Sequence, residues 1–84
     1  MQKDELSIRY DKLVKLTDLE REISKKKREL LFLQHKRAVE ILDTDLMDKV
    51  REELHELLDK ELQIETSYNM TLKLIKEEYI NLIG

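Results

Sequence analysis

Apolar residues recur at intervals of three and four along the first half of the chain, which is the spacing of one face of an α-helix. They are Leu6, Tyr10, Leu13, Leu16, Leu19, Ile23, Leu30, Leu33 and Ile41. The stripe has a gap around Lys26 and Lys27. This pattern predicts an amphipathic helix over about residues 3–42.

A second apolar stripe follows in the other half of the chain and keeps the alternating four-and-three step of a heptad repeat. Its members are Val50, Leu54, Leu57, Ile64, Tyr68, Ile75 and Leu82, with Glu61, Thr71 and Glu78 as polar interruptions. The stripe predicts a second helix over about residues 46–83 that packs against another helix. The alternative is a short third helix capped by the polar run Thr66 to Asn69, although Tyr68 is in register with the stripe.

The tripeptide Asp43-Thr44-Asp45 is the best candidate for a break between the two helices. Short polar side chains bind free backbone N–H groups at a helix start, and acidic groups favour the positive end of the helix dipole. We therefore predict a turn at residues 43–45. The chain would then form an all-α antiparallel helical hairpin, a single domain over residues 1–84, in which residue numbers that add up to about 88 lie side by side.

The distribution of charge fits this hairpin. Residues 24–39 carry six positive charges and one negative, whereas residues 40–65 carry ten negative and three positive. Folding back would place Lys25, Lys26, Lys27 and Arg28 near Glu61 and Glu65, and Lys36 and Arg37 near Glu52, Glu53 and Glu56. Because flanking charges select the partner and orientation of packed helices, we expect the two segments to pair.

Dimerisation is expected because one neighbouring helix cannot cover the apolar run Leu30 to Leu33, which goes nearly all the way around a helix. An 84-residue chain without Cys also has few other sources of stability. We predict that two hairpins form a four-helix bundle or a coiled-coil-like rod. The alternative is a groove for another protein's helix. The expected core and dimer interface comprises Leu13, Leu16, Leu19, Ile23, Leu30, Leu31, Leu33, Val50, Leu54, Leu57, Ile64, Tyr68 and Ile75.

The predicted turn brings both chain ends to one end of the hairpin, where a further apolar and aromatic cluster is expected. Its members are Ile8, Tyr10, Tyr79, Ile80 and Ile83. Exposed clusters of this kind are seldom left without a use, and tyrosine is typical of the centre of an interface. These residues are the candidate contacts with a protein partner.

Nucleic-acid binding through the basic segment at residues 25–37 is the alternative function. Its candidate contacts are Lys25, Lys26, Lys27, Arg28, Lys36 and Arg37. Four consecutive helical residues spread over about 300° of the circumference, so they cannot all face one groove. The net charge of −3 also repels a polyanion, and nucleic acid is therefore disfavoured as a partner.

Metal and catalytic chemistry are not expected. Glu52 and His55 have the spacing of a metal-binding pair, and His35 would lie level with His55, but two imidazoles do not complete a metal site. The opposing residues are the bases Lys36 and Arg37. The chain has no Cys nucleophile and no glycine-rich phosphate loop. We expect neither a cofactor nor an enzyme.

The remaining expectations concern location and function. No apolar run approaches the roughly 20 residues that span a bilayer, and the lack of Cys fits a reducing compartment, so we expect a cytoplasmic protein without membrane contact. The architecture is similar, at the level of fold, to small helical-hairpin dimers that regulate other proteins or bind RNA. The expected function is a homodimeric interaction module that regulates or inhibits another protein.

Overall fold

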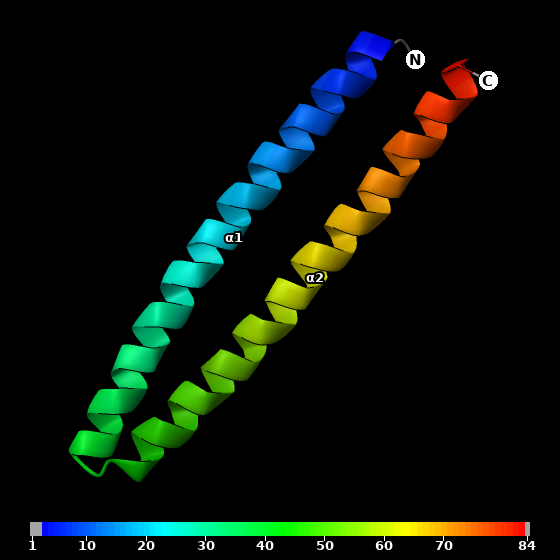
Figure 1. Ribbon diagram of the computed structural model, residues 1–84. Coiled ribbons are helices and arrows are strands. Elements are labelled where there is room, and N and C mark those ends of the chain that lie inside the picture. Colours follow the sequence, from blue (N-terminus) through cyan, green and yellow to red (C-terminus); the bar gives the residue numbers. More distant parts are fainter. Residues whose placement is uncertain (1–2, 84) are drawn as a thin grey trace.

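The computed structural model describes residues 3–83, which form two long antiparallel helices, α1 (Lys3–Glu40) and α2 (Thr44–Ile83) (Figure 1). No strand occurs in this range, and the hairpin measures 62 × 16 × 11 Å. The predicted helical hairpin is confirmed. Residues 1, 2 and 84, which the expected domain includes, lie outside the described residues.

α2 continues without interruption through the polar run from Thr66 to Asn69, so the alternative of a third helix was wrong. The Thr66 hydroxyl donates a hydrogen bond to the Leu62 carbonyl at 2.9 Å. Ser and Thr hydroxyls inside a helix commonly bond the carbonyl four residues earlier, and this leaves the backbone helical. Neither helix contains an apolar segment long enough to cross a membrane, within the residues described.

The turn lies at residues 41–43, two residues earlier than predicted. α1 ends at Glu40 instead of residue 42 because backbone N–H groups of the turn donate hydrogen bonds to its last carbonyls. The Asp43 N–H donates to the Ala38 carbonyl at 2.9 Å, and the Leu42 N–H donates to the Val39 carbonyl at 3.2 Å. This pair of bonds is the Schellman arrangement that closes a helix, and it requires a left-handed residue, here Leu42 with a φ of 56°.

α2 begins at Thr44 instead of 46 because Asp43 is its capping residue. The Asp43 carboxylate accepts a hydrogen bond from the Leu46 N–H at 3.0 Å, and the Asp43 carbonyl accepts one from the Met47 N–H at the same distance. Asp45 then lies in the first turn, where a negative charge is favourable. Capping was therefore predicted in the right tripeptide, but the first of its residues performs it.

α2 faces α1 with the predicted heptad stripe. Val50, Leu57 and Ile75 are buried, and Leu54, Glu61, Ile64, Tyr68, Thr71 and Glu78 are half-buried. Apolar and polar members of the stripe are thus equally part of the contact line, as a heptad seam requires. Leu82, near the end of the helix, is exposed.

α1 faces α2 with a line that is less apolar than its predicted stripe. Its buried residues are Leu6, Thr17, Ser24 and Ala38, and Leu13 and Leu31 are half-buried. Thr17, Ser24, Leu31 and Ala38 are seven residues apart, which places them along one line of the seam. Of the predicted stripe, Leu16, Leu19, Ile23, Leu30 and Leu33 remain 48–64% exposed. Tyr10 and Ile41 are exposed as well. These leucines and Ile23 were predicted as core and dimer interface together, and within one hairpin most of them lie outside the contact with α2.

Replacing Leu42 by glycine is expected to stabilise the hairpin. A left-handed conformation costs a non-glycine residue about 1–2 kcal/mol, and the greater freedom of glycine in the unfolded chain offsets roughly 0.5–1 kcal/mol of this. Leu42 is 80% exposed, so its side chain contributes little burial. Urea unfolding should show a gain of about 0.5–1 kcal/mol for Leu42→Gly. Leu42→Ala, which keeps a Cβ, is the control, and an equal gain in that variant would contradict the explanation.

Candidate protein-interaction site

Ion pairs join the two helices along the hairpin. Within residues 3–83 they are Arg9 with Glu78 at 2.8 Å, Arg21 with Glu65 at 2.6 Å and Arg28 with Glu61 at 3.0 Å. The residue numbers of each pair add up to about 88, which is the predicted register. Arg28 confirms that the basic cluster reaches Glu61, whereas Glu65 pairs with Arg21, which lies outside the cluster.

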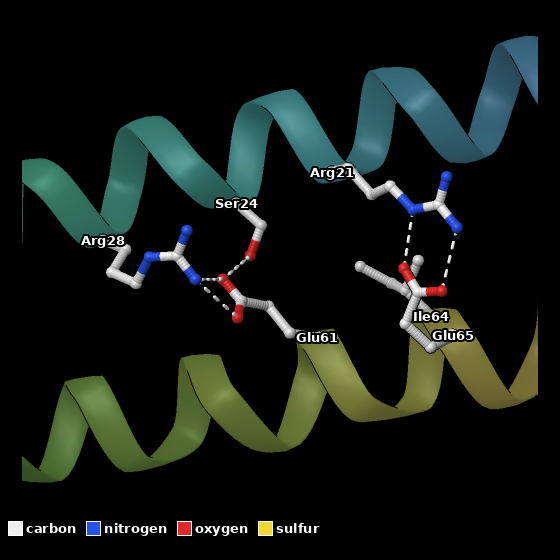
Figure 2. A pocket seen from close by; sticks show the side chains of 6 residues that line it. All are labelled: Arg21, Ser24, Arg28, Glu61, Ile64 and Glu65. Carbon is white, nitrogen blue, oxygen red and sulfur yellow. Dashed lines mark hydrogen bonds and ion pairs between the residues drawn. The ribbon is translucent and has the colours of Figure 1, made fainter.

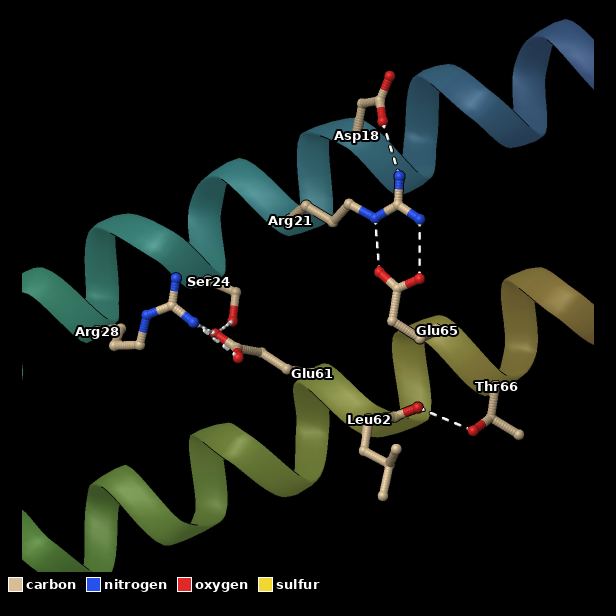
Figure 3. Close-up of polar contacts among 8 residues, drawn as sticks. All are labelled: Asp18, Arg21, Ser24, Arg28, Glu61, Leu62, Glu65 and Thr66. Carbon is tan, nitrogen blue, oxygen red and sulfur yellow. Dashed lines mark hydrogen bonds and ion pairs between the residues drawn. The ribbon is translucent and has the colours of Figure 1, made fainter.

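Arg21 and Glu65 form a bidentate ion pair on the hairpin surface (Figure 3). Nε and Nη2 of Arg21 donate to the two carboxylate oxygens of Glu65 at 2.6 and 2.8 Å, and Nη1 donates to Asp18 at 3.1 Å. The hydrogen bond from Arg21 lowers the pKa of Glu65, and the same bond raises the pKa of Arg21. Because solvent reaches both groups, this pair fixes the register more than it adds stability.

A more buried group lies one turn away, where α1 residues converge on Glu61 (Figure 2). Ser24, 5% exposed, donates its hydroxyl hydrogen to Oε1 of Glu61 at 2.8 Å. Nη1 of Arg28 donates to Oε1 and Oε2 at 3.2 and 3.0 Å. These groups line a cavity of about 190 Å³ together with Ile64. Since the carboxylate already accepts bonds from two α1 residues, its role here is to hold the helices together.

Five half-exposed apolar residues that share one line of α1 form the first candidate interaction surface, which we call the α1 stripe. It consists of Leu16, Leu19, Ile23, Leu30 and Leu33. Thr17, Ser24, Leu31 and Ala38, which face α2, are called the inner line. Leu16, Ile23 and Leu30 each come one position before a residue of this line, which is about 100° around the helix. The α1 stripe therefore lies to one side of the main contact with α2, and Ile23 and Leu30 still line cavities that they share with Leu57. An apolar line at heptad spacing is typical of a helix that packs against a further helix.

A groove at the open end of the hairpin is the second candidate surface. It encloses about 510 Å³ and is lined by Leu6, Tyr10, Leu72, Ile75, Tyr79 and Ile80, with Lys3, Ser7 and Lys76. The Lys3 ammonium lies 5.8 Å from the centre of the Tyr79 ring, within reach of a cation–π contact. We call this cavity the open-end groove.

The sequence pattern anticipated part of the open-end groove. Tyr10, Tyr79 and Ile80 of the predicted partner contact line it together, whereas Ile8 and Ile83 are exposed outside its lining. Leu6, Leu72 and Ile75 were missed as members. The available signal was the hairpin register, which places residues 10–13 of α1 beside residues 75–78 of α2.

The residues of the basic segment lie in different surroundings. Lys25, Lys26, Lys27, Lys36 and Arg37 are exposed, and Arg28 is paired with Glu61. Lys27 lines a cavity with Glu53 and Glu56, and Arg37 lines another with Glu53. Acidic residues of α2 therefore lie beside parts of this segment, as the charge pattern predicted.

The residues considered for metal binding do not gather into a site. His35 is half-buried on α1, and His55 and Glu52 are exposed on α2. Among residues 3–83, no three His, Cys, Asp or Glu side chains are close enough to hold a metal ion. Two histidines alone would not complete a tetrahedral site.

Comparison with known proteins adds no relative. The chain matches no protein-family model, no curated protein and no solved structure. Function must therefore be inferred from the α1 stripe and the open-end groove. Both are apolar surfaces on a hairpin whose helices are also joined by ion pairs.

Glu61→Ala is expected to lower the free energy of unfolding by about 1–3 kcal/mol, because it leaves the buried Ser24 hydroxyl without its acceptor. Urea unfolding followed by circular dichroism, at one protein concentration, measures the change. The control is Glu52→Ala, the same substitution at an exposed position of α2, for which we expect a change within about 0.5 kcal/mol. Equal losses in the two variants would show that the Ser24–Glu61–Arg28 contacts do not hold the hairpin together.

Proposed function

We propose that this protein is a small, non-catalytic interaction module that works as a homodimer and regulates or inhibits another protein in the cytoplasm. The observation that carries the proposal is the half-exposed α1 stripe. Five large apolar side chains on one line of a helix are an unusual surface for a monomer and a common one for a helix with a second neighbour.

The magnitude of the burial supports a dimer. Burying a leucine or isoleucine completely is worth about 1.5–3 kcal/mol, so covering the exposed halves of two α1 stripes is worth on the order of 10 kcal/mol. Associating two chains costs about 4–15 kcal/mol. The two values are comparable, so burial of the α1 stripes offsets the cost of association. Dimerisation at micromolar concentration corresponds to a net gain of about 8 kcal/mol, which the contacts beside the stripes would supply.

The small core of a single hairpin also supports the proposed homodimer. Among residues 3–83 the buried apolar side chains are Leu6, Ala38, Val50, Leu57 and Ile75. A core of this size gives little margin for a chain of 84 residues, and oligomerisation is a common remedy. The second copy would therefore contribute to folding as well as to function.

Contact with the regulated protein is assigned to the open-end groove. Its apolar lining and two tyrosines suit an apolar segment of a partner, since tyrosine combines a large contact area with a hydroxyl that stays in water. Lys3 and Lys76 border the groove and favour acidic residues beside that segment.

Sedimentation equilibrium at micromolar concentration should give twice the chain mass of 10.2 kDa for the native sequence. Leu19→Glu with Leu30→Glu should give a monomer, because the new charges would be buried in the dimer. Leu62→Glu with Leu74→Glu, at exposed apolar positions of α2, is the matched control and should stay dimeric. Circular dichroism reports whether each variant is folded. A folded native monomer, or equal dissociation of both variants, would refute the α1 stripe as the dimer surface.

The partner contact is tested by capture from the native cytoplasm. The native sequence and the control Phe32→Ala, an exposed aromatic residue elsewhere on α1, should retain the same protein. Tyr10→Ala with Tyr79→Ala should lose it. In parallel, nucleic-acid binding is measured at two salt concentrations. Salt-sensitive binding that disappears when Lys25, Lys26 and Lys27 become Gln would instead favour nucleic acid as the partner, because phosphate contacts weaken steeply with salt.

A further inference from the structure

The line of α1 that contains the α1 stripe reads nearly the same in both directions. In order it is Lys12, Leu16, Leu19, Ile23, Lys26, Leu30, Leu33 and Arg37. Reading the line backwards exchanges Leu16 with Leu33 and Leu19 with Leu30. At the two ends it exchanges the basic residues Lys12 and Arg37. Only the central exchange, Ile23 with Lys26, changes the type of residue.

The exchanged residues also occupy complementary positions of the heptad. The steps along the line alternate four and three, so its members fall alternately into the two kinds of seam position. In two antiparallel helices, each layer pairs one kind of position with the other. If the partner's line runs in the opposite direction and is centred on the point between Ser24 and Lys25, every member of one kind meets a member of the other kind. Two copies can therefore form leucine layers on both sides of one centre.

We propose that two copies of this chain pair α1 against α1, antiparallel, about a two-fold axis at this point. This inference rests on the proposed homodimer and specifies its geometry. A two-fold interface uses the same patch on both copies, and a line that is unchanged by reversal is such a patch. In each half of the interface, Leu16 packs on the partner's Leu33 and Leu19 packs on the partner's Leu30.

Lys26 distinguishes this arrangement from a parallel one. A parallel pair would place Lys26 on the partner's Lys26 in one central layer, and like charges would face each other there. The antiparallel pair puts Lys26 beside the partner's Ile23 instead. It also places Lys26 within about one residue, or 1.5 Å along the axis, of the partner's Glu22, which lies on the same flank of the seam. The central lysine then has an opposite charge to bind.

The flanking positions bring together both unlike and like charges. On one flank, Glu20 lies opposite the partner's Lys27, and the two-fold axis repeats this pair. On the other flank, Glu22 approaches the partner's Glu29, and the central lysines lie beside this like-charged contact. The matched contacts at the centre are therefore those of Lys26 with the partner's Glu22 and of Glu20 with the partner's Lys27.

The position of the α1 stripe on the hairpin allows this pairing. It lies roughly 130° around α1 from the line that contacts α2, so each α2 stays on the outer side of the assembly. Because the two α1 helices run in opposite directions, the two open-end grooves lie at opposite ends of a rod. One dimer would then present two partner sites separated by about the length of a hairpin, which is 62 Å.

Spin-label distances test the direction of the pairing. The chain has no Cys, so Lys25→Cys and Asp11→Cys each introduce a single labelling site at an exposed position. The two positions are 14 residues apart, which is two heptads, and so they share one face of α1. In the antiparallel dimer the two Lys25 labels are nearly level. The two Asp11 labels are displaced by 27 residues along the axis, or about 40 Å.

The expected result of double electron–electron resonance is a clearly longer distance for the Asp11 labels than for the Lys25 labels. Equal distances at the two positions would show a parallel pairing and overturn the inference, while the proposed homodimer would stand. A longer distance for the Lys25 labels would overturn it as well, because α1 would not pair about this centre. Loss of the dipolar signal in a chain that sediments as a monomer would instead refute the proposed homodimer.

Discussion

A carboxylate in the middle of an apolar helix face needs hydrogen-bond donors, and this requirement at Glu61 governs the packing of the hairpin. Glu61 belongs to the α2 line that faces α1, and its side chain is largely removed from water. Ser24 and Arg28 supply the donors. A partly buried carboxylate without donors would cost several kcal/mol, so α1 must present this face to α2.

The leucines of α1 are directed outward by the same requirement. With Ser24 on the contact line, the α1 stripe lies on another side of the helix and stays half-exposed. The rotation of α1 about its own axis therefore has two results. It makes the polar contacts between the helices, and it leaves the α1 stripe on the surface of the hairpin. Stability of the hairpin and availability of the α1 stripe are linked for this reason.

Much of the fold was predictable because it depends on local patterns. Heptad spacing gave both helices and the face of α2, and capping chemistry placed the turn within two residues. The sequence pattern did not separate the face of α1 that contacts α2 from its other apolar face, because ranking residues by hydrophobicity selects the leucines, whereas the polar interruptions of the α2 stripe decide the packing. Glu61 and Glu78 each face an arginine of α1 at the predicted register, Arg28 and Arg9. Glu61 also accepts a hydrogen bond from Ser24, which lies on the line of α1 that contacts α2. For the open-end groove, the tyrosines were found because the turn brings both chain ends together, whereas Leu6 and Ile75 were assigned to the apolar stripes and not to the groove.

Polar groups inside a helical interface commonly fix register and partner choice at some expense of stability. In this chain the polar contacts disfavour a hairpin in which α1 is rotated about its own axis. If position 61 were apolar, the α2 stripe would be apolar from Val50 to Tyr68, and α1 could rotate to bury Ile23 and Leu30 against it. That hairpin would have a larger core of its own and no apolar line left for a second copy. The Ser24–Glu61–Arg28 contacts favour the other setting, in which each hairpin keeps a modest core and an apolar outer surface. Under the proposed homodimer, these polar contacts therefore support the dimer without belonging to its interface.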